Sequence, residues 1–339
     1  MKLIRFLVFP FAVVYDLITR VRNFLFDRNV LKSTSFDIPV IAVGNLSVGG
    51  TGKTPQIEYL IRLLQQDFKV AVLSRGYKRK TVGFQLVNKT HTAEDVGDEP
   101  LQFFSKYEDI HVAVDANRTN GIHQLLTEVK PDVILLDDAY QHRKVKAGFY
   151  ILLTKYNDLY VNDFLLPTGN LRESRRGAKR ADVIVVTKCP NELNENEMKS
   201  IKKRLQLLPS QQLYFSKIEY NEHLKGTDSE LQLGDLKEEI VLVTGIANPT
   251  SLLSYLKDKK IDFTHLKYPD HHHFSEQDIF KIKKEQSKLQ SDNKIILTTE
   301  KDYVRLKGKL ENLYYIEIHN SFLSNQESFD LEVKKFVNK

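Results

Sequence analysis

Residues 38–66 read IPVIAVGNLSVGGTGKTPQIEYLIRLLQQ and predict a strand, a glycine-rich loop and a helix, in that order. The apolar run at 39–43 contains β-branched residues and is typical of a short buried strand. Apolar side chains then recur at helical spacing, at Ile57, Leu60, Ile61 and Leu64. The glycines therefore lie where a strand ends and a helix begins.

This loop has the chemistry of a phosphate-binding site. Glycines let backbone N–H groups turn toward phosphate oxygens, and the helix start adds its positive dipole end. We expect Lys53 to reach the β- and γ-phosphates of a nucleotide and Thr54 to place its hydroxyl on Mg²⁺. The strict Walker A pattern has glycine where this chain has Ser47, but GGTGKT is intact. The residues expected to hold the nucleotide are Ser47, Gly49, Gly50, Thr51, Gly52, Lys53 and Thr54.

Two carboxylates follow a second apolar strand. Residues 132–138 read DVILLDD, so Asp137 and Asp138 lie at the carboxyl end of a strand at 133–136. Ligands bind at that edge of open α/β sheets, and we expect one of the pair to hold Mg²⁺ directly or through water. A third strand, at 183–186, ends in TKCP, which lacks the guanine-reading acid of Asn-Lys-x-Asp. ATP is therefore the expected nucleotide.

Three further stretches are candidates for an acceptor site. EDVGDE at 94–99 is rich in acids, and such a stretch is most often a solvated surface, so the residues alone leave a catalytic role open. Arg75 and Tyr77 follow a strand at 70–73, and their loop should open on the same sheet edge. The basic stretch 166–182 suits an anionic acceptor or a transferring phosphate, although it is equally typical of a solvated face.

Composition excludes several classes. The chain has 339 residues and a net charge of +6, a milder and less clustered excess than nucleic-acid binders show. The one cysteine, Cys189, permits no intrachain disulfide and no cysteine-based zinc site, and it suggests a reducing compartment. Such an excess suits an anionic small substrate or an anionic membrane surface.

The N-terminal segment predicts an amphipathic helix. Its uninterrupted apolar run covers ten residues, 6–15, whereas a spanning helix needs about 20. Val14, Ile18, Val21 and Leu25 fall on one face, and Asp16, Arg20, Asn23 and Asp27 on the other. With Lys2, Arg5, Arg22 and Arg28 nearby, the segment resembles a helix that lies in a membrane interface. The alternative is a helix packed on the protein's own core.

The pattern of strands and helices restarts near residue 239, which predicts a second, smaller α/β domain without a phosphate loop. We expect an interfacial helix at 1–30, a P-loop core at 31–215 and the smaller domain at 216–339. The main sheet is expected to be mostly parallel with helices on both faces. The tract PDHHHF at 269–274 is a poor metal site, because successive side chains diverge.

These motifs, in this order, resemble the tetraacyldisaccharide 4'-kinases of lipid A biosynthesis. The resemblance rests on VGNLSVGGTGKTP, SRGYKRK, VGDEP, LLDDAYQHR, LPTGNLRES, PDHHHF and TTEKDYVRL, and covers nearly the whole chain. Where members often continue Gly-Phe-Gln-His after the paired acids, this chain has Ala139-Tyr140-Gln141-His142.

The resemblance implies an ATP- and Mg²⁺-dependent phosphotransferase. It would phosphorylate the 4'-hydroxyl of an acylated glucosamine disaccharide 1-phosphate, peripherally, on the cytoplasmic face of a Gram-negative inner membrane. No nucleic acid and no obligate protein partner are implied, and the smaller domain would close over the nucleotide. By the same resemblance Asp98 is the catalytic base, supported by His271, with Lys53 on the phosphates. Thr54, Asp137 and Asp138 would serve the metal, and Arg75, Tyr77, Glu99, Arg172 and Glu173 the substrate.

Two other classes stay open. A P-loop ATPase that switches a protein partner would hydrolyse ATP without labelling a lipid. Such proteins typically carry a second lysine before the paired glycines, where this chain has Val48. A metabolite kinase with a self-packed N-terminal helix would be independent of detergent.

Overall fold

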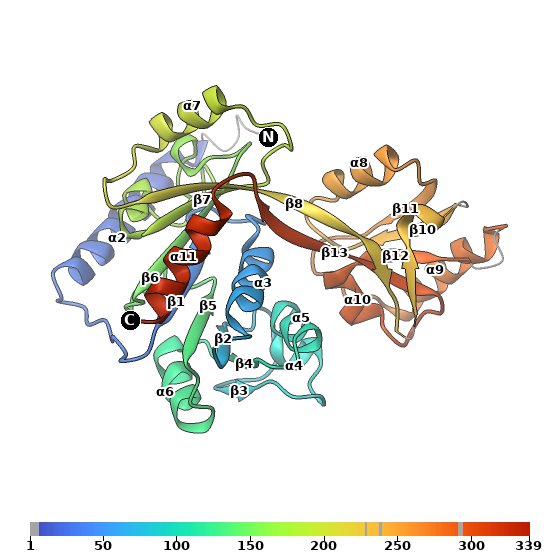
Figure 1. Ribbon diagram of the computed structural model, residues 1–339, viewed down its shortest axis with the longest axis horizontal. Coiled ribbons are helices and arrows are strands. Elements are labelled where there is room, and N and C mark those ends of the chain that lie inside the picture. Colours follow the sequence, from blue (N-terminus) through green and yellow to red (C-terminus); the bar gives the residue numbers. More distant parts are fainter. Residues whose placement is uncertain (1–6, 228, 237–238, 291–293) are drawn as a thin grey trace. The chain divides into compact units, whose positions relative to one another are not determined.

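The computed structural model describes residues 7–227, 229–236, 239–290 and 294–339. The chain divides into two compact units. The first contains the chain up to Ile218 together with Asn320–Lys339, and the second is Glu219–His319 (Figure 1). Each unit is an α/β layer structure.

The first unit is built on a mostly parallel sheet. Its strands are β1 (Val40–Asn45), β2 (Val70–Ser74), β3 (Gln85–Leu86), β4 (His111–Val114), β5 (Val133–Asp137), β6 (Phe149–Lys155), β7 (Val183–Thr187) and the start of β8 (Gln212–Lys225). Their order is β8-β7-β6-β1-β5-β2-β4-β3, and the β3–β4 pair is antiparallel. The strand before the glycine-rich loop, β1, thus lies at the centre, between β5 and β6.

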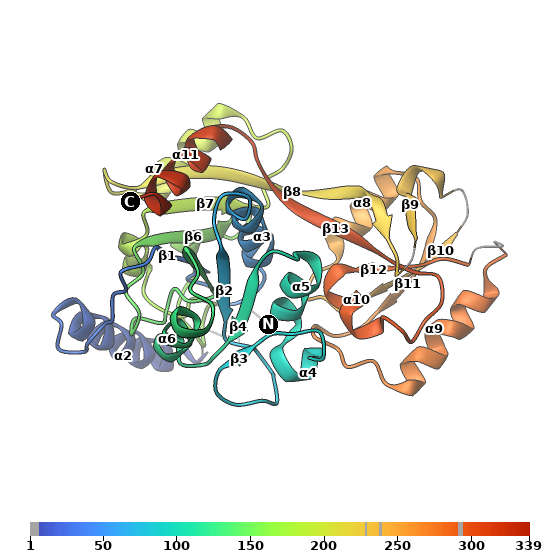
Figure 2. The ribbon, with the colours of Figure 1, turned by 60° about the horizontal axis from the view of Figure 1, so that its bottom comes forward.

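Helices cover both faces of this sheet (Figures 1 and 2). Their bounds are α3 (Lys53–Leu64), α4 (Ala93–Val96), α5 (Asp98–Lys106), α6 (Arg118–Glu128), α7 (Glu195–Leu205) and α11 (Gln326–Val337), with 3-10 turns η1 (Tyr160–Asn162) and η2 (Arg175–Arg180). Successive strand residues point to opposite faces, so Ile41 and Val43 pack with α3, α5 and α11, whereas Val40 and Ala42 pack with α6. Helix α7 lies on the core that contains Leu152.

The register of the central strands brings the predicted site residues to one edge. Val43 of β1 pairs with Asp137 of β5, and Leu73 of β2 pairs with Leu136. Because these strands are parallel, the phosphate loop, Asp138 and Arg75 all follow carboxyl ends of neighbouring strands. This is the edge at which open α/β sheets bind ligands.

The second unit has its own sheet and core. Its parallel strands β10 (Ile240–Thr244), β11 (Phe263–Lys267), β12 (Ile296–Thr299) and β13 (Leu313–Phe322) follow the order β11-β10-β12-β13, and β9 (Glu230–Gln232) pairs with β8. Helix α8 (Thr250–Asp258) packs on one face, and α9 (Glu276–Lys288) and α10 (Glu300–Leu306) on the other. The predicted capping box of Ser275 and Asp278 begins α9.

The C-terminal segment belongs to the first unit and not, as the predicted domain bounds have it, to the second. We expected 216–339 as one domain, but Asn320–Lys339 belongs to the first unit. Helix α11 buries Phe329, Val333 and Val337 in the core formed with α3. An amphipathic helix shows from its sequence which face is apolar, but not which sheet that face covers.

Helix α2 (Phe9–Asp27) packs on the first unit through polar contacts. The Tyr15 hydroxyl donates to the Arg172 carbonyl oxygen at 2.8 Å, and Asn23 Nδ2 donates to Glu173 Oε2 at 2.8 Å. Ala12 and Phe26 are buried, but most of its large apolar side chains face outward: Phe11 is 68% and Leu17 is 62% exposed. Lys2 and Arg5 lie outside the described residues. No helix in the described ranges has both the length and the apolar character needed to cross a membrane.

The placement of α11 predicts the cost of truncating its buried face. Phe329→Ala should lower the free energy of unfolding by about 3–5 kcal/mol, because it leaves a cavity in the main core. Leu331→Ala, on the same helix but 69% exposed, is the matched control and should change it by less than about 0.5 kcal/mol. Urea denaturation checks both, and equal effects would contradict the assignment.

Candidate active site

The phosphate loop is held in shape by its neighbours. Gly49 and Gly52 have φ of 101° and 89°, a left-handed conformation that favours glycine. Inside the loop, Asn45 Nδ2 donates to Thr51 Oγ1 at 2.8 Å, and from β7 Thr187 Oγ1 donates to the Thr51 carbonyl oxygen at 2.7 Å. Helix α3 begins at Lys53 directly after Gly52. The predicted strand, loop and helix are confirmed.

Asp138 lies between two cations. Arg172 Nη1 and Nη2 donate to its two carboxylate oxygens at 3.1 and 2.8 Å, and Lys53 Nζ lies 3.7 Å from Oδ1. Arg172 also donates to Asn45 Oδ1, which ties the pair to the end of β1. Burial tends to raise the pKa of Asp138, but the charges of Lys53 and Arg172 outweigh it and hold the pKa below its usual range. Asp138 is therefore a carboxylate.

Asp137 has the opposite electrostatics. Its side chain is buried and accepts a hydrogen bond from Ser74 Oγ at 3.0 Å. Burial and the adjacent charge of Asp138 raise the pKa of Asp137 to about 6, and the charge of Glu99 acts in the same direction. Two adjacent acids thus sit in opposite environments, a pattern characteristic of functional sites.

Arg118, at the start of α6, belongs to none of the motifs that predict the site. Its side chain is 2% exposed, and burial lowers its pKa to about 10. Nη1 donates to the Asp115 carbonyl oxygen at 2.8 Å and Nη2 to that of Asp137 at 3.3 Å. Within the described residues its Nε has no hydrogen-bond partner. A buried cation beside two carboxylates is rare in a structural core. The surrounding sequence, RTNG at 118–121, does not predict that this arginine is buried.

Two further polar residues reach the site. His142 follows the paired acids, and burial together with the charge of Arg118 lowers its pKa to about 4, so its imidazole is neutral near pH 7. Lys188, after β7, places Nζ 3.9 Å from where a Cβ atom on Gly50 would lie. Burial and the charges of Lys155 and Lys53 lower the pKa of Lys188. The sequence TKCP at 187–190 predicted the end of a strand, but it did not predict that Lys188 lies beside the phosphate loop.

The acidic stretch 94–99 separates into distinct roles. Glu94 forms an exposed ion pair with Lys80, and Asp95 caps α4 by accepting from the Thr92 N–H and hydroxyl. Asp98 instead begins α5 and is 2% exposed. A solvated loop is therefore a wrong description of Asp98, although it fits Glu94.

The loop that carries Arg75 and Tyr77 packs beside Asp98. Gly97 has φ of 95°, and a Cβ atom there would lie 3.3 Å from the Tyr77 carbonyl oxygen and 3.4 Å from Gly76 Cα. The charge of Arg75 contributes to the lowered pKa of Arg118, so Arg75 lies near the paired acids, and its side chain is exposed. Tyr77 is 60% exposed. Arg75 and Glu99 thus lie near the paired acids, and the loop of Tyr77 packs against Gly97, whereas the roles of these residues stay predictions.

Glu173 is buried and anchors its surroundings. Its oxygens accept from Arg180 Nη2 at 2.8 Å, Gln141 Nε2 at 3.0 Å and Asn23 Nδ2 at 2.8 Å. Gln141 also donates to the Asn45 carbonyl oxygen at 2.8 Å. These contacts connect α2 with the strand end that carries the phosphate loop. A substrate role for Glu173 stays a prediction.

The histidine tract lies in the second unit. His272 is engaged structurally, because its ring stacks on Tyr268 at 4.8 Å and Nε2 lies 3.0 Å from Asp278 Oδ2. His271 has φ of 58°, and Lys301 Nζ lies 3.0 Å from its Nε2. Because an ammonium group can only donate, Nε2 is the acceptor in this contact. The choice of His271 over its neighbours stays a prediction.

Comparisons with known proteins agree on one family. The family model described as tetraacyldisaccharide-1-P 4'-kinase matches residues 4–338. The tetraacyldisaccharide 4'-kinase of Flavobacterium johnsoniae is 55% identical over 99% of this chain and 98% of its own, and that of Bacteroides thetaiotaomicron is 48% identical over 88% and 82%. The Aquifex aeolicus LpxK crystal structure, in complex with ATP, has a TM-score of 0.80, 30% identity and coverage of 98% and 99%.

The raised pKa of Asp137 predicts an unusual stability profile. A carboxyl whose pKa rises on folding makes the native state bind more protons than the unfolded chain between about pH 4 and 6, so stability falls as pH rises through that window. Asp137→Asn removes this cost and should increase the free energy of unfolding by about 2–3 kcal/mol at pH 8, but by little at pH 4.

Urea denaturation at the two pH values measures the effect. Asp109→Asn, an exposed acid of the same unit, is the control and should leave the profile unchanged. A destabilised Asp137→Asn at pH 8 would refute the assigned electrostatics.

Proposed function

The chain belongs to the tetraacyldisaccharide-1-P 4'-kinase family, and we propose that it transfers the γ-phosphoryl group of ATP to the 4'-hydroxyl of an acylated glucosamine disaccharide 1-phosphate, a step of lipid A biosynthesis. Within that full-length match, the observation that carries the proposal is the cluster of Lys53, Asp138 and Arg172 at the phosphate loop. It joins a nucleotide-binding lysine to a carboxylate and an arginine, the groups that phosphoryl transfer requires.

The first unit has the donor set for ATP with Mg²⁺. Thr54, Asp138 and Asp137 are the residues that would hold the metal, which supplies charge neutralisation between the phosphates when bound. The fit rests on Asp137, whose raised pKa reflects burial and a neighbouring negative charge that a divalent cation would offset. The phosphates of ATP compete with Asp138 for Lys53 and Arg172, so both cations are set in place before the nucleotide arrives.

In the proposed reaction Asp98 acts as the base. Its carboxylate takes the proton of the 4'-hydroxyl as that oxygen forms a bond to the γ-phosphorus, and the bond from this phosphorus to the bridging oxygen breaks to release ADP. Lys53 and Arg172 stabilise the charge that develops on the transferred group. We assign His271 as the second catalytic side chain. Arg75, Tyr77 and Glu99 are proposed to bind the acceptor.

The outward apolar face of α2 supports attachment to a membrane. A self-packed helix buries its apolar face, whereas α2 buries only Ala12 and Phe26 and leaves most of its large apolar side chains exposed. Tyr15 and Asn23 add hydrogen bonds to the body. Because the acceptor carries acyl chains, we propose that the protein acts peripherally at the cytoplasmic face of the inner membrane, with α2 in the interface. The same face argues against a metabolite kinase that acts in free solution.

The role of Asp98 is tested by following γ-labelled phosphate into the acylated disaccharide 1-phosphate in detergent micelles. Asp98→Asn should lower kcat by about 10²–10⁴-fold with little change in ATP affinity, since the side chain acts on the acceptor. Glu94→Gln, a surface acid of the same stretch, should keep kcat. Lys53→Ala should lose transfer. Normal kcat in Asp98→Asn would remove this residue from the mechanism, and ATP hydrolysis by wild type without labelled lipid would favour a switch ATPase.

The role of α2 is tested by vesicle co-sedimentation. Leu17→Gln combined with Ile18→Gln should weaken binding by at least about tenfold, because two exposed apolar side chains no longer enter the bilayer. The control Leu17→Met with Ile18→Leu keeps the apolar surface and should bind as wild type. Both should unfold at the wild-type urea concentration. Undiminished binding of the glutamine variant would refute the interfacial placement of α2.

A further inference from the structure

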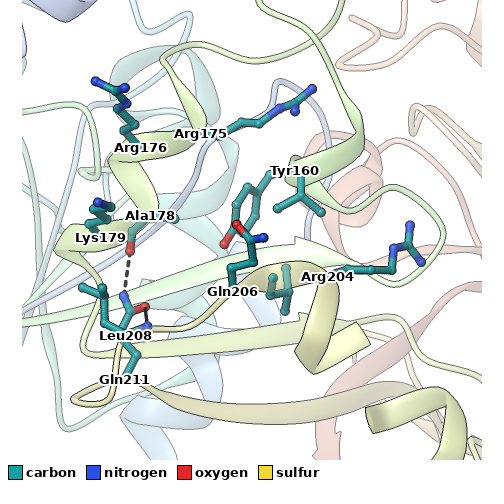
Figure 3. A pocket seen from close by; sticks show the side chains of 11 residues that line it. Tyr160, Arg175, Arg176, Ala178, Lys179, Arg204, Gln206, Leu208 and Gln211 are labelled. Carbon is teal, nitrogen blue, oxygen red and sulfur yellow. Dashed lines mark hydrogen bonds between the residues drawn. The ribbon is translucent and has the colours of Figure 1, made fainter. Parts of the chain in front are cut away.

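The first unit has a hollow that lies apart from the residues of the phosphate loop and the paired acids. Its volume is about 390 Å³, within the usual range of small-molecule sites. It lies among η1, η2, the end of α7 and the segment that leads into β8 (Figure 3). The side chains that line it include Tyr160, Val161, Leu205, Leu208, Gln206 and Gln211.

The charge around this hollow has one sign. Arg175, Arg176 and Lys179 come from η2 and Arg204 from the last turn of α7, and among the described residues no acidic side chain lines the hollow. Figure 3 shows the head groups of Arg175 and Arg204 extending away from the apolar floor. Positively charged side chains around a concave surface raise the local concentration of anions. The hollow therefore suits an anionic group with an apolar neighbour.

The walls of the hollow are fixed by hydrogen bonds. Gln211 Nε2 donates to the carbonyl oxygens of Ala178 and Ala181 at 2.8 and 2.7 Å, and its Oε1 accepts from the Leu208 N–H at 3.0 Å. This buried amide thereby ties η2 to the segment before β8. Arg175 is held as well, because its Nε and Nη2 donate to the Asp163 carbonyl oxygen at 3.1 and 2.7 Å. The cations of η2 are thus presented on a rigid support.

Two ring contacts connect Arg175, at the rim of the hollow, with α2. The Arg175 guanidinium lies 5.9 Å from the ring centre of Phe164, and that ring meets Phe9 of α2 edge to face at 6.5 Å. Phe164 and Phe9 are themselves 45% and 43% exposed. A cationic hollow and an apolar helix joined by two exposed rings match the two parts of a charged amphiphile.

We propose that this hollow binds the phosphodiester headgroup of an anionic phospholipid whose acyl chains contact α2. The proposal rests on the proposed membrane function and adds to it a specific lipid contact. The cations beside α2 favour anionic bilayers in general, whereas the hollow adds a defined contact with the headgroup. The kinase site keeps its own cations, Lys53 and Arg172, for the nucleotide.

Co-sedimentation with vesicles of phosphatidylcholine, with or without phosphatidylglycerol, tests the proposal. Wild type should bind the anionic vesicles more tightly. Lys179→Gln combined with Arg204→Gln should weaken that binding by roughly tenfold, because two cations leave the hollow. The control Lys202→Gln with Lys203→Gln removes equal charge from the same α7 but outside the hollow, and should lose no more than about threefold.

The outcomes separate this inference from the proposed function. Kinase activity in detergent micelles should be equal in both double variants and wild type. Lys179 comes from the basic stretch 166–182, but it lines the hollow together with Arg204, whereas Arg172 is the residue of that stretch that contacts Asp138. Equal losses of vesicle binding in the two variants would reduce the effect to net charge and overturn the proposal, as would equal binding of wild type to both vesicle types. Abolition of the preference by millimolar inorganic phosphate would make the hollow a free-phosphate site and also overturn it. Absent kinase activity in wild type would instead refute the proposed function.

Discussion

Asp138 is clamped between Lys53 and Arg172, and most of the first unit serves to place these three groups. Lys53 begins the helix after β1, Asp138 follows β5, and Arg172 comes from the segment before η2. The parallel register of β1 and β5 brings the first two together, while Asn45 at the end of β1 accepts a hydrogen bond from the third. In this arrangement one carboxylate holds two cations at the phosphate loop, where the phosphates of ATP would take its place on them.

The site has a stability cost at Asp137. Its carboxyl is buried next to another acid, and its pKa is raised to about 6 because neither burial nor the neighbour favours the charge. A core built for stability would place an apolar or amide side chain there. The buried guanidinium of Arg118 has a similar character, with a pKa lowered to about 10 and an Nε atom that lacks a partner among the described residues. Both groups are typical of a binding site, in which the charges of a ligand offset those of buried side chains.

Much of this could be predicted from the sequence, because local patterns carry it. The phosphate loop, the DD pair and the Ser275 capping box depend on neighbouring residues, and the structure has them where the motifs indicate. What depends on long-range packing could not be read: the return of α11 to the first unit, the burial of Arg118, and the difference between Glu94 on the surface and Asp98 in the interior. The pattern of α2 predicted an amphipathic helix. Its outward apolar face followed from the structure, because periodicity shows a face but not its partner.

The central claim is that this phosphate loop serves transfer to a lipid rather than hydrolysis. The most direct measurement is the ratio of ADP formed to phosphate gained by the acylated disaccharide 1-phosphate, with the new phosphomonoester located by mass spectrometry. The account predicts one phosphate on the 4'-oxygen for each ADP. ADP released without a second phosphate on the disaccharide, or a phosphate at another hydroxyl, would contradict it.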